Sequence, residues 1–210
     1  MRSGMKIKAV LFDLDGVLVD ATEWHYEALN RALGLFGYNI ARYEHLTTYN
    51  GLPTRKKLDM LSVEKGFPRG LHSLVNKIKQ KYTREEILRN CTPVFEKEFM
   101  LHQLKREGYK LAVCSNSIRE SVELMLRGSG VWELFDCVLS NEDVRQAKPD
   151  PEIYFAACER LGIKPHEALI VEDALHGIEA ARRCGGVLCE VAGFNEVDYA
   201  RVKRSLEGAG

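Results

Sequence analysis

The sequence lacks the features that would assign it to a nucleic-acid-binding or membrane class. Its 30 lysines and arginines balance 30 aspartates and glutamates, so no positive field is expected to attract nucleic acid. No stretch approaches the run of about 18 apolar residues that spans a membrane, and acids interrupt the N-terminal apolar run where a signal peptide would continue. We therefore expect a cytoplasmic protein without nucleic-acid or membrane partners.

Organised cysteine chemistry is also lacking. The six cysteines include no CxxC pair, and no histidine lies at zinc-finger spacing from them. Cys114, Cys137 and Cys189 lie within apolar runs, where they are expected to pack as small hydrophobic residues. No organised histidine partner indicates a catalytic thiolate. Reduced thiols in a cytoplasmic enzyme are therefore the expected state.

The chain does contain short apolar strands that alternate with helices. Strands are predicted at residues 7–12, 110–114, 135–139, 168–171 and 186–191. Helices are predicted at about 93–107, 118–127, 152–161 and 174–184, with a short one at the C-terminus. This alternation is typical of a parallel sheet with right-handed crossovers.

A long helical segment interrupts the alternation. Between Asp20 and Cys91 no convincing strand is evident, and helical patterns continue between breaks such as Gly51-Leu52-Pro53. Roughly seventy residues are too many for one connection between neighbouring strands. We therefore predict an α/β fold in which residues 1–20 and 92–210 form the sheet domain and residues 21–91 are an inserted helical domain.

The first predicted strand ends at two carboxylates. Asp13, Asp15 and Gly16 directly follow its apolar residues, and ligands of open α/β sheets bind at the carboxyl ends of the strands. An unpaired buried carboxylate costs several kcal/mol, so a compensating cation is expected. Mg²⁺, a hard divalent ion that prefers oxygen ligands, is the natural candidate.

Polar side chains also follow the later strands. Ser115 and Asn116 come after the second strand, Lys148 lies in the loop after the third, and Glu172 and Asp173 come after the fourth. Because the carboxyl ends of parallel strands meet at one edge of a sheet, we expect these groups to converge on one crevice. Four acids, a lysine and a hydroxyl group suit a metal ion and a phosphate group.

Each signal has a simpler interpretation when it is taken alone. Asp13 would suit an ordinary acidic turn, and Ser115 would suit a helix cap. Lys148 would suit a solvated loop charge, and Glu172-Asp173 would suit a turn that precedes a helix. Their occurrence in this order at successive strand ends favours one shared site over four coincidences.

Together these segments resemble the four ordered motifs of the haloacid dehalogenase superfamily. The motifs are DLDGVLVD, the serine of CSNS, AKPDPEIY and VEDALHGIEAA. The segment between the first two motifs resembles the helical cap of subfamily I, nearest to β-phosphoglucomutase-like phosphatases. The resemblance implies a Rossmann-like, doubly wound sheet that carries an α-helical cap domain.

The resemblance also implies catalytic roles. Asp13 would be the nucleophile, and Asp15 would be the general acid and base. Ser115, Asn116 and Lys148 would bind the substrate, with Ser115 and Lys148 on its phosphate group.

A Mg²⁺ ion is implied by the same resemblance. Asp13, the carbonyl oxygen of Asp15 and Asp173 would be its ligands, with Glu172 adjacent or acting through a water. Two acids after the first strand also argue against a dehalogenase, which uses a single aspartate and no metal.

Residues 49–57 resemble the substrate-specificity loop of the cap. Gly51, Thr54 and Arg55 are its candidate substrate-binding residues. Its basic residues could bind an acidic group of the substrate, or they could form a solvated helix start. His25 is a further candidate substrate-binding residue, because it matches a hinge-side histidine of mutase-like relatives, and it would equally suit a helix surface.

We therefore expect a monomeric Mg²⁺-dependent phosphohydrolase that acts on a small phosphomonoester, a sugar phosphate, through an aspartyl-phosphate. A β-phosphoglucomutase-type phosphosugar mutase is the alternative enzyme. It is disfavoured because family mutases usually carry threonine where this chain has Ala21, and because their phosphate-binding cap arginine aligns with Thr54. A catalytically silent binding or regulatory domain is the alternative of another class, since a fold does not fix a function.

Overall fold

The computed structural model describes residues 7–208 and contains one five-stranded sheet. All strand pairs are parallel, and the strand order is β3-β2-β1-β4-β5, so β1 is central. The strands are β1 (Ala9–Phe12), β2 (Lys110–Cys114), β3 (Cys137–Leu139), β4 (Ala168–Glu172) and β5 (Val187–Glu190).

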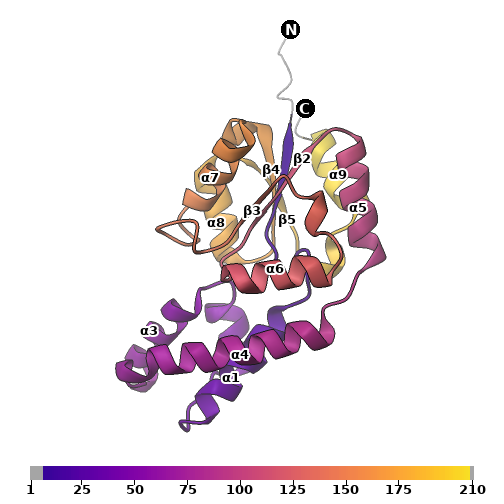
Figure 1. Cartoon of the computed structure of the whole chain (residues 1–210). Helices are drawn as coiled ribbons and strands as arrows, with labels where there is room; N and C mark the ends of the chain where they lie inside the picture. The colour runs from indigo at the N-terminus through magenta and orange to yellow at the C-terminus, as the bar shows by residue number, and fades with distance from the viewer. Residues whose placement is uncertain (1–6, 209–210) are drawn as a thin grey trace.

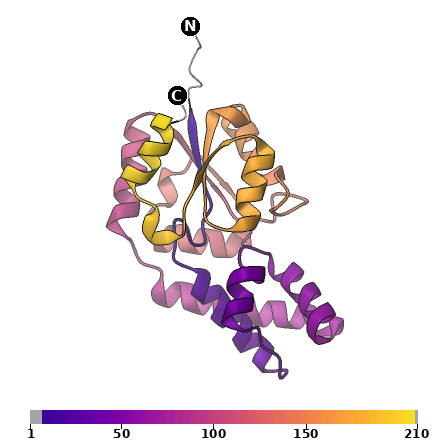
Figure 2. The same ribbon diagram turned by 180° about the vertical axis from the view of Figure 1, so that it is seen from behind.

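Helices cover both faces of this sheet (Figures 1 and 2). They are α5 (Phe95–Arg106), α6 (Arg119–Gly128) and α9 (Tyr199–Gly208) on one face, and α7 (Glu152–Leu161) and α8 (Leu175–Cys184) on the other. The predicted α/β, doubly wound parallel sheet is confirmed.

The predicted and observed strands differ only at their ends. β2 has the predicted bounds, whereas β1 begins two residues late, at Ala9. β3 begins at Cys137, because Trp132–Leu134 form a short 3-10 helix just before it.

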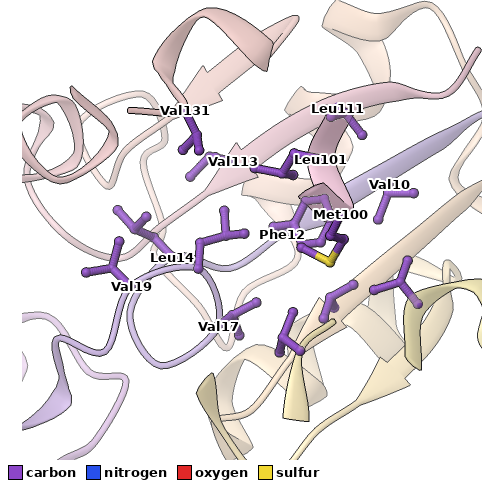
Figure 3. Close-up of a cluster of buried hydrophobic side chains, with 14 of the residues drawn as sticks. Val10, Phe12, Leu14, Val17, Val19, Met100, Leu101, Leu111, Val113 and Val131 are labelled. Atoms are coloured by element: carbon purple, nitrogen blue, oxygen red, sulfur yellow. The ribbon is translucent and has the colours of Figure 1, made fainter. Parts of the chain in front are cut away.

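The two faces of β1 belong to two hydrophobic clusters. Val10 and Phe12 pack in one cluster with residues of α5, including Met100 (Figure 3). Ala9 and Leu11 pack in the other, against α7 and α8. A strand that is covered on both faces is an uninterrupted apolar run, and the change to Asp13 marks the point where the chain leaves this core.

The helical segment of residues 21–91 lies below the sheet in Figure 1. Its helices are α1 (Thr22–Gly34), α2 (Arg42–Glu44), a π-helical turn (His45–Tyr49), α3 (Thr54–Lys65), a 3-10 turn (Arg69–Leu71) and α4 (His72–Asn90). They share a hydrophobic cluster of their own, which includes Leu29, Leu58 and Val75. The division into domains at residues 20 and 91 stays a prediction. Within residues 7–208, no helix is both long and apolar enough to cross a membrane.

The central position of β1 predicts that its core side chains are costly to truncate. Leu11 is fully buried between Ala112 and Ile170 of the neighbouring strands. We expect Leu11→Ala to lower the free energy of unfolding by about 2–5 kcal/mol, through lost burial and a residual cavity. Urea denaturation measures this change. The control is Leu88→Ala on α4, where the side chain is 65% exposed and the expected change is within about 0.5 kcal/mol. Equal losses in both variants would contradict the assignment.

Candidate active site

The chain leaves β1 through a tight turn that presents two carboxylates. Gly16 has φ +89°, and a β-carbon there would lie 2.3 Å from Oδ2 of Asp173. Only glycine allows this backbone conformation and this close approach at once. The turn therefore brings the strand-one acids directly against the residues that follow β4.

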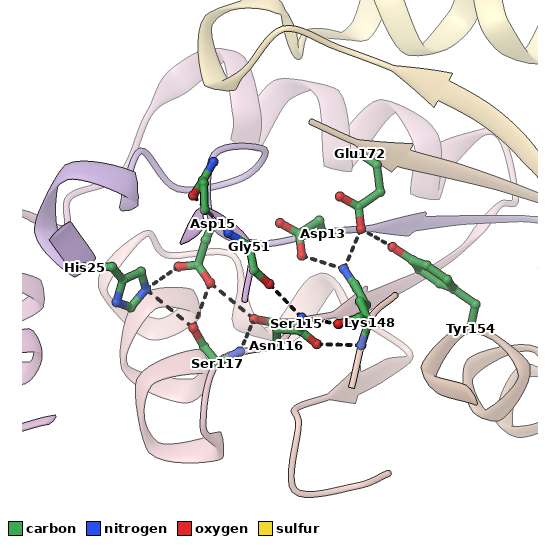
Figure 4. A network of polar contacts seen from close by, with 11 residues as sticks. Asp13, Asp15, His25, Gly51, Ser115, Asn116, Ser117, Lys148, Tyr154 and Glu172 are labelled. Carbon is green, nitrogen blue, oxygen red and sulfur yellow. Dashed lines mark hydrogen bonds and ion pairs between the residues drawn. The ribbon is translucent and has the colours of Figure 1, made fainter. Parts of the chain in front are cut away.

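Lys148 joins two of the predicted acidic residues. Its Nζ donates to Oδ1 of Asp13 at 2.7 Å and to Oε1 of Glu172 at 2.5 Å (Figure 4). The hydroxyl group of Tyr154 also donates to Oε1 of Glu172. Lys148 is only 2% exposed, so it is an interior charge fixed by its partners and not a solvated loop residue.

The charges of this cluster do not balance. Burial raises the pKa of Asp13 well above its ordinary value, and the charges of Glu172 and Asp173 add to this effect. Burial likewise raises the pKa of Asp173 to about 7, with Glu172 as the next cause. Burial disfavours the charged form of Lys148, but Asp13 and Glu172 outweigh it and raise its pKa. One ammonium group is therefore too little positive charge for three carboxylates.

Three carboxylates are arranged so that one ion can bind them all. Asp13, Glu172 and Asp173 each place an oxygen within 4.8 Å of the others. Among residues 7–208, Oε2 of Glu172 and Oδ1 of Asp173 are buried without a hydrogen-bond partner. Such oxygens are costly unless a cation or donor satisfies them. An all-oxygen, carboxylate donor set fits Mg²⁺.

The side chain of Asp15 turns away from this group. Its Oδ1 lies 2.8 Å from Nε2 of His25, and its Oδ2 accepts a hydrogen bond from the Ser117 hydroxyl at 2.8 Å (Figure 4). The Ser115 hydroxyl donates to the same oxygen at 3.3 Å. Behind His25, Nζ of Lys79 lies 3.1 Å from Nδ1. The two aspartates of the first motif therefore have separate partners.

The partners of Asp15 fix its protonation state. Burial alone would raise the pKa of Asp15, but interactions with His25 and Ser117 outweigh it and lower the pKa to about 2. Burial and the charge of Lys79 lower the pKa of His25. Near neutral pH, a neutral His25 accepts a hydrogen bond from Lys79 at Nδ1 and donates one from Nε2 to an ionised Asp15.

Asn116 ties three loops together at the site. Its Nδ2 donates a hydrogen bond to the carbonyl oxygen of Gly51 at 2.7 Å, and its Oδ1 accepts one from the backbone N–H of Lys148 at 3.0 Å. Gly51 has φ +75°, and a β-carbon there would lie 2.9 Å from Cβ of Ala174. The helical segment thus contacts the residues that follow β2 and β4.

A cavity of about 150 Å³ lies between these elements. It brings together most of the predicted site residues: Asp13, Asp15, His25, Gly51, Thr54, Arg55, Asn116, Lys148 and Glu172. Ser115 and Asp173 are not among the lining residues, whereas Ser117 is. Ser115 is completely buried, and its hydroxyl group donates to Asp15 from behind the cavity surface. The predicted phosphate-binding role of Ser115, like the other residue roles, stays a prediction.

The sequence of this chain matches a known family along most of its length. A model of the haloacid dehalogenase-like hydrolase family matches residues 10–191. The chain belongs to this family. The predictions of this family, of the fold class and of a hydrolase are therefore confirmed.

Similar proteins agree with the family assignment. Pyrophosphatase PpaX of Bacillus velezensis is 29% identical over 89% of this chain and 84% of its own length. A phosphorylated carbohydrates phosphatase of Thermotoga maritima is 29% identical over 85% of this chain and 82% of its own length. The solved structure of β-phosphoglucomutase from Clostridium difficile has a TM-score of 0.83 at 21% identity, covering 96% of this chain and 98% of that chain, and shows the fold alone.

Four polar residues near the site were not predicted individually, although one of them, Lys57, belongs to the predicted specificity loop 49–57. Ser117 and Tyr154 lie within the quoted motifs, so their proximity to the site could have been inferred from spacing. Lys57 and Lys79 lie on charged helices, where only the folded structure shows that they are buried. No local signal distinguishes them from the exposed lysines beside them.

The position of Glu172 predicts a strict requirement for glycine on α8. A β-carbon at Gly177 would lie 2.1 Å from the Glu172 carboxylate, so alanine must displace that carboxylate from Lys148. We expect Gly177→Ala to lower the free energy of unfolding by about 1–3 kcal/mol and to weaken Mg²⁺ binding in calorimetric titration.

The matched control for this substitution is Gly34→Ala. Gly34 is also helical, and no atom lies within 4 Å of its added β-carbon. Alanine is expected to leave stability unchanged or to raise it by up to about 1 kcal/mol. Unchanged Mg²⁺ affinity in Gly177→Ala would remove Glu172 from the metal site.

Proposed function

We propose that this hydrolase is a Mg²⁺-dependent phosphatase that acts on a small phosphomonoester, a sugar phosphate, through a phosphorylated Asp13. One observation carries the proposal. Asp13 lines the cavity, is hydrogen-bonded to Lys148, and lies close to the carboxylates of Glu172 and Asp173. In this arrangement the lysine can bind phosphoryl oxygens, the carboxylates can bind a cation, and Asp13 can attack the phosphorus atom.

The family and its members support the general activity. The chain belongs to a hydrolase family, and its relatives include proteins named pyrophosphatase and phosphorylated carbohydrates phosphatase. Both findings support the cleavage of phosphate esters. These names favour a phosphatase over a mutase. The name of the Thermotoga maritima relative also supports a carbohydrate phosphate as substrate. A monomeric state and a cytoplasmic location stay predictions.

Asp13 has the features of a nucleophile that is held in place. Lys148 fixes its Oδ1, and Asp13 is 8% exposed where it lines the cavity. A carboxylate that approaches a phosphate dianion at 4 Å meets a repulsion of about 4 kcal/mol per charge pair at an effective dielectric constant near 20. Lys148 offsets part of that repulsion and orients the carboxylate.

Asp13, Glu172 and Asp173 are the residues that would hold Mg²⁺. The ion, when bound, supplies positive charge that stabilises the phosphoryl oxygens during transfer. The carbonyl oxygen of Asp15 is the further ligand implied by the family resemblance. Burial raises the pKa of Asp13, and positive charge held by these carboxylates would favour the ionised form that attacks phosphorus.

Asp15 is placed to move protons in both half-reactions. In its ionised form it can take a proton from the water that attacks the phosphorylated Asp13. In the first step it must instead donate a proton to the leaving oxygen. The hydrogen-bond chain from Lys79 through His25 can supply that proton: Nζ gives one to Nδ1 while Nε2 gives one to Asp15.

The mutase alternative has weaker support. The similarity to a β-phosphoglucomutase structure, at 21% identity, concerns the fold alone. Phosphate release from a panel of sugar phosphates, measured with Mg²⁺ and again with EDTA, tests the phosphatase. Release that EDTA abolishes supports it. Interconversion of hexose 1- and 6-phosphates that requires a bisphosphate would replace it with the mutase, and no turnover at all would contradict both.

Replacement of the nucleophile gives the most direct prediction. Asp13→Asn removes one of three crowded carboxylates and keeps its shape, so the fold is expected to remain and the thermal midpoint to stay equal or rise. Phosphate release is expected to fall by a factor of about 10⁴ or more, because the amide cannot form the phosphoenzyme. Activity within ten-fold of the unmodified enzyme would exclude Asp13 as the nucleophile.

Replacement of the second aspartate is expected to separate the two half-reactions. Asp15→Asn cannot activate water, so the phosphoenzyme should accumulate with substrates whose leaving group departs without protonation, such as p-nitrophenyl phosphate. Intact-protein mass spectrometry after rapid acid quenching detects the added phosphate. Its absence, with Asp13→Asn as the blank, would contradict the acid-base role of Asp15.

A further inference from the structure

Tyr154, on α7, is completely buried beside the catalytic residues, and the proposed chemistry gives it no role. Its hydroxyl group donates a hydrogen bond to Oε1 of Glu172 (Figure 4). The ammonium group of Lys148 lies over its ring, with 5.1 Å between Nζ and the ring centroid. Tyr154 does not line the cavity, so it can act on a bound group only through these two neighbours.

The two carboxylate oxygens of Glu172 have different surroundings. Oε1 accepts hydrogen bonds from Lys148, at 2.5 Å, and from Tyr154. Oε2 is buried and, within the described residues 7–208, has no hydrogen-bond partner. A carboxylate oxygen can accept about two hydrogen bonds, so the acceptor capacity of Oε1 is filled. Only Oε2 is therefore left to bind a cation.

Tyr154 is the donor that serves Glu172 alone. Lys148 is shared, because its Nζ also donates to Oδ1 of Asp13 at 2.7 Å, and in the proposed reaction it binds phosphoryl oxygens as well. The hydroxyl group of Tyr154 has no second acceptor among residues 7–208. The orientation of the Glu172 carboxylate during a reaction cycle therefore depends on the tyrosine more than on the lysine.

A carboxylate with one free oxygen distinguishes between divalent cations. Mg²⁺ requires a near-ideal octahedron of oxygens, whereas Ca²⁺ accepts more oxygens in a flexible geometry, including both oxygens of one carboxylate. We propose that Tyr154 is a positioning residue that restricts Glu172 to one metal-facing oxygen and thereby makes the site selective for Mg²⁺ over Ca²⁺. This inference rests on the metal site of the proposed phosphatase and adds a residue that determines which cation it binds.

A purely structural role is the alternative, because Tyr154 also packs in the hydrophobic cluster between the sheet, α7 and α8. Tyr154→Phe separates the two roles: it keeps the ring, its packing and its contact with Lys148, and removes only the hydroxyl group. A structural role predicts a lower thermal midpoint and equal losses of affinity for all divalent cations. A positioning role predicts losses that differ between the cations.

The test is calorimetric titration of Mg²⁺, and separately of Ca²⁺, into the metal-free protein. We expect Tyr154→Phe to weaken Mg²⁺ binding about ten-fold or more, as for the loss of other hydrogen bonds that orient a metal ligand. Ca²⁺ binding should change less than about three-fold, because Ca²⁺ tolerates a carboxylate that tilts to present both oxygens. The ratio of the two dissociation constants therefore shifts toward Ca²⁺.

The matched control is Tyr199→Phe. The Tyr199 hydroxyl group also donates to a glutamate, Glu107, but this pair is exposed and lies outside the cavity. We expect neither affinity to change in this variant. The unmodified protein supplies a test without any substitution, because it should bind Mg²⁺ more tightly than Ca²⁺. Equal or tighter binding of Ca²⁺ would overturn the inference.

Metal titration and turnover can fail separately. Mg²⁺ binding needs no substrate, so a Mg²⁺ preference that depends on Tyr154, in a protein that releases no phosphate, would refute the phosphatase and leave this inference in place. In an active enzyme, saturating Mg²⁺ should restore the kcat of Tyr154→Phe to within about two-fold, because the hydroxyl group acts on metal affinity and does not touch the reacting atoms. A kcat that stays low at saturating Mg²⁺, or equal losses for Mg²⁺ and Ca²⁺, would overturn the inference.

Discussion

The structure depends on the burial of three carboxylates around a single lysine at the edge of a parallel sheet. Asp13, Glu172 and Asp173 converge because β1 and β4 are neighbours and run in the same direction. Lys148 compensates one charge, and two carboxylate oxygens remain buried without a donor. Natural proteins rarely leave such groups unsatisfied. The imbalance is the physical reason to expect a cation and a phosphoryl group at this edge.

Close backbone approach is what makes this crowding possible. Gly16, Gly51 and Gly177 each lie where a β-carbon would collide with a neighbour. Two of those neighbours are the carboxylates of Asp173 and Glu172 themselves. The glycines therefore act as part of the site, because they let loops from distant parts of the sequence approach the acids without side chains between them. Glycine at these positions lowers the stability of the fold relative to alanine, and it is retained because the site requires this close approach.

The sequence predicted the sheet side of the site far better than the helical side. Strand-end acids carry a strong local signal: an apolar run that stops at Asp13, or at Glu172 and Asp173, can be read without knowing the fold. Parallel register then brings them together, as found. The lysines of the helical segment have no such signal. Lys57 and Lys77 look alike in the sequence, and only tertiary packing buries one and exposes the other.

The same limit explains why pairing partners were missed. His25 was weighed as a substrate ligand or a surface residue, and the structure places it on Asp15 with Lys79 behind it. The Ser115 hydroxyl group donates to Asp15, a contact that the motif does not specify, and its role at the phosphate stays a prediction. Motif spacing identifies which residues gather at a strand end. It does not specify the rotamers that decide which of them touch, since these depend on packing across elements.

The two sides of the cavity have opposite electrostatic character. The sheet side concentrates carboxylates, and the helical side contributes Lys57, with Lys79 behind His25. A cation would reduce the repulsion among the carboxylates of the sheet side, and an anionic group would pair with the lysine of the helical side. Because the proposed nucleophile Asp13 belongs to the sheet side, the phosphoryl group of a substrate must bind there, and the leaving part of the substrate then faces the helical side.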